Sequence, residues 1–202
     1  MTPRVALDRG LGELALALPA SAREQLLAYV ALLAKWNRTY NLTAIRAPLS
    51  MVSHHLLDSL AVLPHLPMPA ARAALADAGS GAGLPGIPLA VARPDWRVTL
   101  AEANQKKAAF LRQAVIELGL SNVEVHEGRV EAWRPATRFA VVISRAFAEL
   151  AEFIAACRHL VEPGGFLAAM KGVRPKNAVD CTLVKLTVPQ LDAERHLLLC
   201  RT

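Results

Sequence analysis

The chain has 202 residues, of which 53% are hydrophobic and 20% are charged. This composition excludes an intrinsically disordered protein, and the length suits one full-sized domain with a small additional segment. The net charge of +6 favours a polyanionic partner, although a solvated basic surface would give the same count.

The first 70 residues are expected to be helical. One helix is predicted over 21–36, because Ser21 and Glu24 form a capping-box pattern and apolar residues then recur at helical spacing. A second helix is predicted from Ser50 up to a proline-rich stretch, again with apolar residues on one face. We therefore expect residues 1–70 to form a helical segment packed on the rest.

From residue 73 onward, short apolar runs alternate with helical patterns, which is typical of βαβ units and a parallel sheet. Strands are predicted at 73–77, 97–102, 123–126, 139–144 and 165–171. Helices are predicted between them at 87–92, 105–118 and 147–160.

The last two strand-like runs, 182–188 and 196–199, are joined by a loop too short for a crossover helix. They should pair antiparallel at the end of the sheet. The prediction is a Rossmann-like α/β fold whose core spans residues 71–202, with a mostly parallel seven-stranded sheet and an antiparallel last strand.

A glycine-rich stretch, DAGSGAGLPG, follows the first predicted strand. Glycines at alternate positions let the backbone turn sharply and approach a ligand closely. The spacing is GxGxG, which differs from the GxGxxG of dinucleotide-binding proteins, and Asp77 precedes the first glycine by two residues. A plain tight turn is the alternative interpretation.

Glu102 closes the second predicted strand, where nucleoside-binding α/β proteins place a carboxylate that accepts hydrogen bonds from the ribose hydroxyls. Alternatively, it could only stabilise the N-terminus of the next helix. Both NAD and S-adenosylmethionine are bound in this way. Asp77 and the missing third-glycine spacing favour S-adenosylmethionine, because a carboxylate suits a cationic amino-acid moiety better than a pyrophosphate.

Several motifs resemble the bacterial 16S rRNA guanine-N7 methyltransferase family known as RsmG or GidB. They are DAGSGAGLPGIPLA, ANQKKAAFLRQ, GRVEAW, VISRAFA, MKG and LDAERHL, with WNRTYNLT and HLLDSL ahead of the glycine loop. The likeness spans nearly the whole chain, and GxGLPGIP followed downstream by SRAF is far more specific than a glycine loop alone.

The resemblance implies a class I methyltransferase that transfers the methyl group of S-adenosylmethionine to N7 of one guanine, conventionally position 527, in 16S rRNA. Its partner would be 16S rRNA or the small ribosomal subunit, and we expect a monomer. The cofactor-binding residues implied by the motifs and by the glycine loop are Gly79, Gly81, Leu84, Glu102, Val130, Glu131 and Arg145.

Basic residues near the predicted strand ends are the candidates for contact with RNA. Arg145 and Lys171 are predicted to act in catalysis, and Arg129, Lys171 and Arg195 to bind RNA. A surface charge is the alternative for Arg129 and Arg195. Guanine N7 carries a free lone pair and no proton, so methyl transfer would need positioning but no general base.

Other polar and aromatic residues are expected to be structural. His55 and Asp58 could suggest a metal or acid-base site, but a packed, hydrogen-bonded pair fits better without further ligands nearby. Trp36 and Tyr40 are expected to be core residues or to pack between the helical segment and the sheet, and a base-stacking platform is the alternative interpretation.

The three cysteines are widely spaced, without a CxxC pair or histidines at ligand spacing. This pattern predicts reduced thiols in a cytoplasmic protein without a metal site. No apolar run has the length of a membrane span, so we expect a soluble protein. Two other functions remain open: a dehydrogenase that uses NAD, and a non-catalytic RNA-binding assembly factor that kept the fold.

Overall fold

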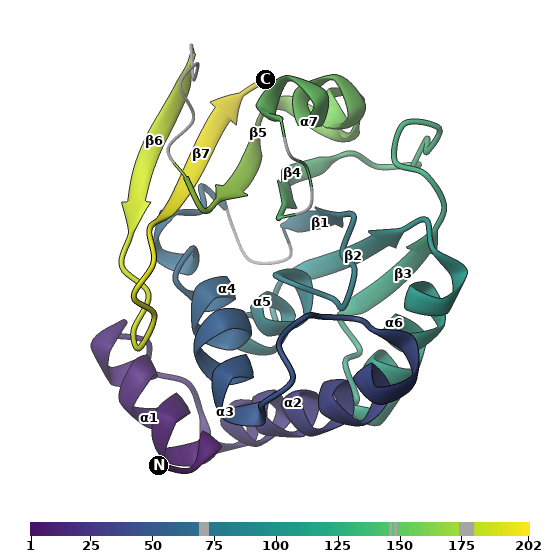
Figure 1. Cartoon of the computed structure of the whole chain (residues 1–202). Helices are drawn as coiled ribbons and strands as arrows, with labels where there is room; N and C mark the ends of the chain where they lie inside the picture. The colour runs from purple at the N-terminus through teal and green to yellow at the C-terminus, as the bar shows by residue number, and fades with distance from the viewer. Residues whose placement is uncertain (69–72, 146, 148, 174–179) are drawn as a thin grey trace.

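The computed structural model describes residues 1–68, 73–145, 147, 149–173 and 180–202 (Figure 1). Within these residues seven strands form one sheet in the order β3-β2-β1-β4-β5-β7-β6. Neighbouring strands pair in parallel except at β7, which runs antiparallel to β5 and β6. The strands are β1 (Ala74–Ala78), β2 (Arg97–Glu102), β3 (Val123–Glu127), β4 (Phe139–Ser144), β5 (Val161–Lys171), β6 (Cys181–Leu186) and β7 (Arg195–Arg201). The predicted fold class is confirmed.

Helices cover both faces of this sheet (Figure 1). On one face α5 (Gly86–Ala92) and α6 (Gln105–Glu117) join the N-terminal helices in a large apolar core. On the other face α7 (Leu150–Cys157) packs on strand residues that include several alanines. The α-helix predicted over 147–160 thus begins later and ends at Cys157, where the 3₁₀ turn η3 (Arg158–Leu160) follows. Residues 146 and 148 lie outside the described part of the chain.

The N-terminal helices differ in detail from the prediction. Helix α1 (Pro3–Glu13) has no counterpart among the predicted elements. Helix α2 (Ala20–Tyr40) has Pro19 as its N-cap and no side-chain capping bond, so the predicted capping box at Ser21 is wrong. Proline, with its φ fixed near the helical value and a β-region ψ here, already begins the helix before Ser21.

The helix predicted from Ser50 consists of three consecutive pieces: α3 (Pro48–Met51), the π-helical η1 (Val52–Leu57) and α4 (Asp58–Leu60). A single π-helical turn inside a helix is rare and is frequently found at functional sites. A short 3₁₀ turn, η2 (Leu63–His65), follows. The boundary predicted at residue 70 lies among residues that the structure does not describe.

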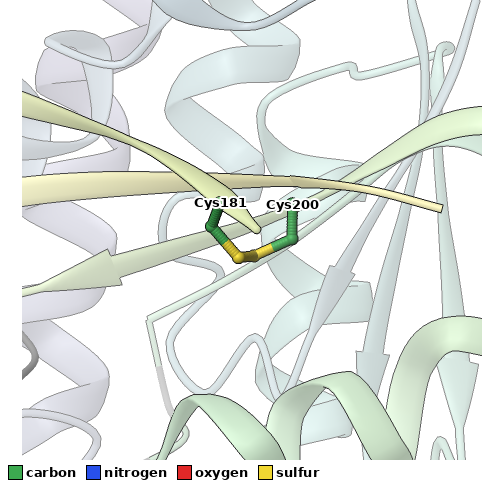
Figure 2. Close-up of a disulfide and its surroundings, with 2 residues drawn as sticks. All are labelled: Cys181 and Cys200. Carbon is green, nitrogen blue, oxygen red and sulfur yellow. A yellow bond between two sulfur atoms is a disulfide. The ribbon is translucent and has the colours of Figure 1, made fainter. Parts of the chain in front are cut away.

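Strands β6 and β7 form an antiparallel pair, as predicted, and a disulfide joins them (Figure 2). Their register places Cys181 directly opposite Cys200, with the two Cα atoms 4.2 Å apart. The expectation of reduced thiols is therefore wrong for this pair, because spacing along the chain does not reveal which residues a strand register brings together. Cys157 is free and buried.

None of the helices in the described ranges is both long enough and apolar enough to cross a membrane.

Candidate active site

The glycine loop turns the chain from the end of β1 into α5. Gly81 has a φ of +58°, and a Cβ added there would meet no atom closer than the Gly79 oxygen, at 4.0 Å. At Gly83, in contrast, an added Cβ would lie 2.4 Å from Ile87 Cδ1. The absence of a side chain at Gly83 therefore lets α5 pack closely against the loop. At Gly81 the glycine permits a left-handed backbone conformation, and the space beside it is open.

Helix α2 is hydrogen-bonded to the glycine loop. The Tyr29 hydroxyl, which is fully buried, donates a hydrogen bond of 2.7 Å to the Ala82 carbonyl oxygen. The N-terminal helical segment thus holds the loop as well as completing the core.

Asp77 lies near the end of β1, just before the glycine loop, and the residue is fully buried. Its Oδ2 accepts a 2.8 Å hydrogen bond from the Gly86 amide, which begins α5. Burial raises the pKa of Asp77 to about 7, although the bond from Gly86 opposes the shift. The predicted direct role of Asp77 beside a cationic ligand is not supported by this placement, because the carboxylate faces the base of the loop.

The raised pKa predicts a pH-dependent stability. The folded state binds the Asp77 proton more tightly than the unfolded chain, whose ordinary pKa is near 3.8. The free energy of unfolding should therefore fall, by up to about 4 kcal/mol, as the pH rises from about 4 to 7. In the Asp77→Asn variant this contribution should be absent, and urea unfolding at several pH values would show it. Parallel profiles for the two proteins would contradict the prediction.

Glu102 stands beside the loop at the end of β2 and is almost fully buried, with 8% exposure. Its Oε2 accepts a hydrogen bond from the Gly81 amide and its Oε1 one from the Asn104 amide, both 2.8 Å long. These two bonds fix the carboxylate. Each oxygen keeps a second acceptor position, which is the requirement for binding two hydroxyl groups of a ligand.

A cavity of about 200 Å³ opens at the glycine loop. The residues that line it include Gly79, Gly81 and Leu84, together with Thr43, Lys107 and Arg145. Three of the predicted cofactor residues of the loop, and Arg145, thus share one cavity.

A second cavity, of about 330 Å³, is lined by three of the predicted basic residues: Arg145, Lys171 and Arg195. Arg145 lines both cavities. It directly follows β4, and it therefore stands between the glycine loop and this basic cavity.

Asp58 holds two of these cations in place. Its Oδ2 lies 3.0 Å from Arg145 Nη1 and its Oδ1 2.8 Å from Arg195 Nε. The Asp58 side chain is 2% exposed, whereas the arginine side chains are 29% and 24% exposed. One buried carboxylate thus orients two guanidinium groups that remain accessible from the cavity. This role is not evident in the sequence, because the partners are 87 and 137 residues away.

His55 does not pair with Asp58, so the predicted hydrogen-bonded pair is wrong. Its Nδ1 donates to the His54 carbonyl oxygen at 2.9 Å, which leaves Nε2 to accept from the Thr43 hydroxyl at 2.8 Å. Burial, followed by the positive charge of Arg145, lowers the pKa of His55 to about 4. His55 is therefore a neutral, structural histidine at physiological pH.

Lys171 ends β5, and its Nζ donates a 2.5 Å hydrogen bond to the Phe147 carbonyl oxygen. Burial lowers the pKa of Lys171, while Glu149 and Glu152 oppose the shift. The described residues contain no group of three or more side chains that could hold a metal ion.

The remaining predicted residues follow β3, where the Gly128 amide donates to the Glu102 carbonyl oxygen at 3.0 Å. Val130 is buried against the α7 side of the sheet, whereas Arg129 and Glu131 are exposed. Arg129 lines neither of the two cavities described above, so the structure does not bring it together with the other basic residues.

Comparison with known proteins identifies the family to which this chain belongs. The family described as "rRNA small subunit methyltransferase G" (GidB) matches residues 22–198. The protein of Burkholderia pseudomallei (strain 1106a) named "Ribosomal RNA small subunit methyltransferase G" is 51% identical, over 98% of this chain and 90% of its own length.

Solved structures share the fold at low sequence identity. A predicted O-methyltransferase from Agrobacterium tumefaciens matches 72% of this chain and 78% of its own, with a TM-score of 0.55 and 24% identity. A SAM-dependent methyltransferase from Aquifex aeolicus matches 75% and 92%, with a TM-score of 0.56 and 15% identity. The fold is thus that of the class I methyltransferases, and the chain belongs to the rRNA small subunit methyltransferase G family.

Proposed function

We propose that this protein transfers the methyl group of S-adenosylmethionine to N7 of a guanine, conventionally position 527, in the 16S rRNA of the small ribosomal subunit. The observation that carries the proposal is the position of Arg145, which lines both the glycine-loop cavity and the basic cavity. A cofactor in the first cavity and a guanine in the second would meet at this residue.

The glycine loop fits the cofactor, because Gly81 leaves open the space that a Cβ would occupy. Gly79, Gly81 and Leu84 would border the methionine and adenosine parts. The two free acceptor positions of Glu102 suit the ribose hydroxyls. Val130 and Glu131 would flank the adenine. When bound, S-adenosylmethionine supplies a methyl group on a positively charged sulfur.

The chain's own residues would act by positioning. Guanine N7 has an in-plane lone pair and no proton, so no side chain must remove one. Arg145 and Lys171 would hold O6 or a phosphate, since a donor bound to N7 would block the nucleophile. Arg195 would bind phosphate beside them. In A-form RNA, N7 faces a groove that side chains cannot enter, so the guanine must be unpaired or splayed out.

The direct test is methyl transfer from labelled S-adenosylmethionine to small subunits and to naked 16S rRNA that lack the modification, with the modified base mapped. Label on N7 of the expected guanine supports the proposal, and label on another atom or another RNA overturns it. An assembly factor would bind the RNA and transfer no methyl group. A dehydrogenase would be stabilised against thermal unfolding by NAD instead of S-adenosylmethionine.

The absence of a general base predicts a nearly flat pH profile. With RNA and cofactor saturating, the single-turnover rate should change by less than about threefold from about pH 6.5 to 8.5. His55 cannot titrate in this range, because its pKa is about 4. The Asp77→Asn variant is the control, since Asp77 titrates near pH 7 beneath the loop. A rise of about tenfold per pH unit in both proteins would indicate a base and a different acceptor atom.

A further inference from the structure

The end of α2 and the segment after it carry exposed basic residues and no acidic residues. The sequence contains no Asp or Glu between Glu24 and Asp58, whereas Lys35, Arg38 and Arg46 fall in this interval. All three of these basic residues are exposed. A surface of one sign attracts a polyanion and is not neutralised by ion pairs within its own segment.

Tyr40 is the last residue of α2. Its ring stacks on Trp36, with the ring centres 5.2 Å apart and 28° between the planes. The Trp36 ring in turn packs on Phe110 of α6, with the two ring centres 5.6 Å apart. The expected packing between the helical segment and the core is thus confirmed for Trp36. Tyr40, however, is 42% exposed, the only aromatic residue among the large hydrophobic residues exposed in the described part of the chain.

The surface adjoins the cavity at the glycine loop. Leu42 and Thr43, which follow Tyr40 in the chain, line that cavity together with Lys107 of α6. Arg46 lies across from Asn41, whose Oδ1 accepts a 3.5 Å hydrogen bond from the Arg46 guanidinium. Tyr40 is therefore two residues along the chain from the wall of the predicted cofactor site, which includes the basic side chain of Lys107.

We propose that Tyr40 is a stacking platform for an unpaired RNA base that neighbours the target guanine, with Arg46 and Lys107 binding the adjoining phosphates. The proposal rests on the proposed function, which supplies the RNA substrate. Proteins recognise RNA sequences mostly in single-stranded loops and bulges, where unstacked bases can stack on aromatic side chains. Because the Tyr40 ring already stacks on Trp36, binding a base on its other face costs little side-chain entropy. Stacking on an aromatic ring tolerates any base.

Binding to two probes tests this inference: a short unstructured RNA carrying a fluorescent label, and the same sequence as a perfect duplex. Tyr40→Ala should raise the dissociation constant of the single strand by at least about fivefold and leave that of the duplex unchanged. Tyr40→Phe should bind as the wild type does. Tyr40→Leu keeps an apolar cover on Trp36 and loses the ring, so it should behave as Tyr40→Ala does.

The charges are tested through the salt dependence of binding. Arg46→Gln should reduce the slope of log K against log salt by about 0.7 for a single strand. Arg138→Gln is the matched control, because this exposed arginine precedes β4 at the opposite end of the sheet from Arg145. It should leave the slope unchanged.

The outcomes separate the two proposals. Equal single-strand affinity in wild type and in both ring-deleting variants overturns the role of Tyr40 while wild-type methyl transfer stands. If Tyr40→Ala weakens binding only to assembled subunits, the ring contacts a ribosomal protein and the inference is wrong. A wild-type protein that neither binds RNA nor transfers a methyl group overturns the proposed function itself. Unchanged affinity of Tyr40→Ala for S-adenosylmethionine shows that a loss concerns the RNA alone.

Discussion

The Asp58→Ala variant should lose methyl transfer by about 100-fold, since displacing a positioning group by about 1 Å has effects of this size. Without the carboxylate, Arg145 and Arg195 become two neighbouring cations with no counter-ion between them. Their guanidinium groups should then move apart and no longer hold the guanine in line with the methyl group. Single-turnover rates at saturating cofactor and RNA would measure the loss.

Stability should change much less than activity in this variant. Both arginine side chains reach solvent, so water can replace the lost carboxylate, and the cost should be about 1–2 kcal/mol in place of the larger penalty of a fully buried pair. Asp95→Ala is the control, because Asp95 pairs with Arg93 on the surface and its loss should cost less than about 1 kcal/mol. Full activity in Asp58→Ala would refute the positioning role.

The second large effect is expected at Gly81. A valine there should weaken S-adenosylmethionine binding by more than about 100-fold, because its side chain would project into the space left for the ligand. The positive φ of Gly81 adds backbone strain of about 1–2 kcal/mol, so the variant should also be somewhat less stable. Calorimetric titration with the cofactor and thermal unfolding would separate the two effects.

Gly119 offers a matched control for that strain. It has a φ of +63°, and an added Cβ would have no neighbour within 4 Å. Gly119 follows α6 and does not line the glycine-loop cavity. Gly119→Val should therefore lose a similar amount of stability and keep full cofactor affinity. If both variants bound S-adenosylmethionine equally well, the assignment of the loop would be wrong.

The sheet could be predicted from the sequence because its strands carry strong local signals. Residues 139–143 are a continuous apolar run, and these residues and Ser144 are all buried, which is the pattern of a central parallel strand. Asn104 is the N-cap of helix α6, and its side chain accepts hydrogen bonds from the Lys106 and Lys107 amides, so the start of this helix is also encoded locally.

Features that depend on distant contacts could not be predicted. Helix α1 has a weak local signal, because it contains Gly10 and Gly12. Gly10 is required by its tertiary contact, since a Cβ there would lie 2.2 Å from Leu57 Cδ1. The Cys181–Cys200 bond depends in the same way on the register of two strands.

The residues of the candidate site also differ in whether the sequence reveals their role. The glycine loop and Glu102 are recognisable from their spacing, and the structure brings them together through the Gly81 amide. The role of Asp58 cannot be recognised from the sequence, because a single aspartate on a helix does not indicate which distant arginines will lie beside it. The π-helical turn of η1 directly precedes Asp58, in keeping with the frequent occurrence of such turns at functional sites.

The position of Arg145 in the wall of both cavities has a thermodynamic consequence. If filling one cavity shifts this guanidinium, the affinity of the other cavity changes with it. Linkage is reciprocal, so any factor by which RNA tightens the binding of S-adenosylmethionine is the factor by which the cofactor tightens the binding of RNA. The two ligands would then bind cooperatively, with the salt bridge between Arg145 and Asp58 as the element that transmits the coupling.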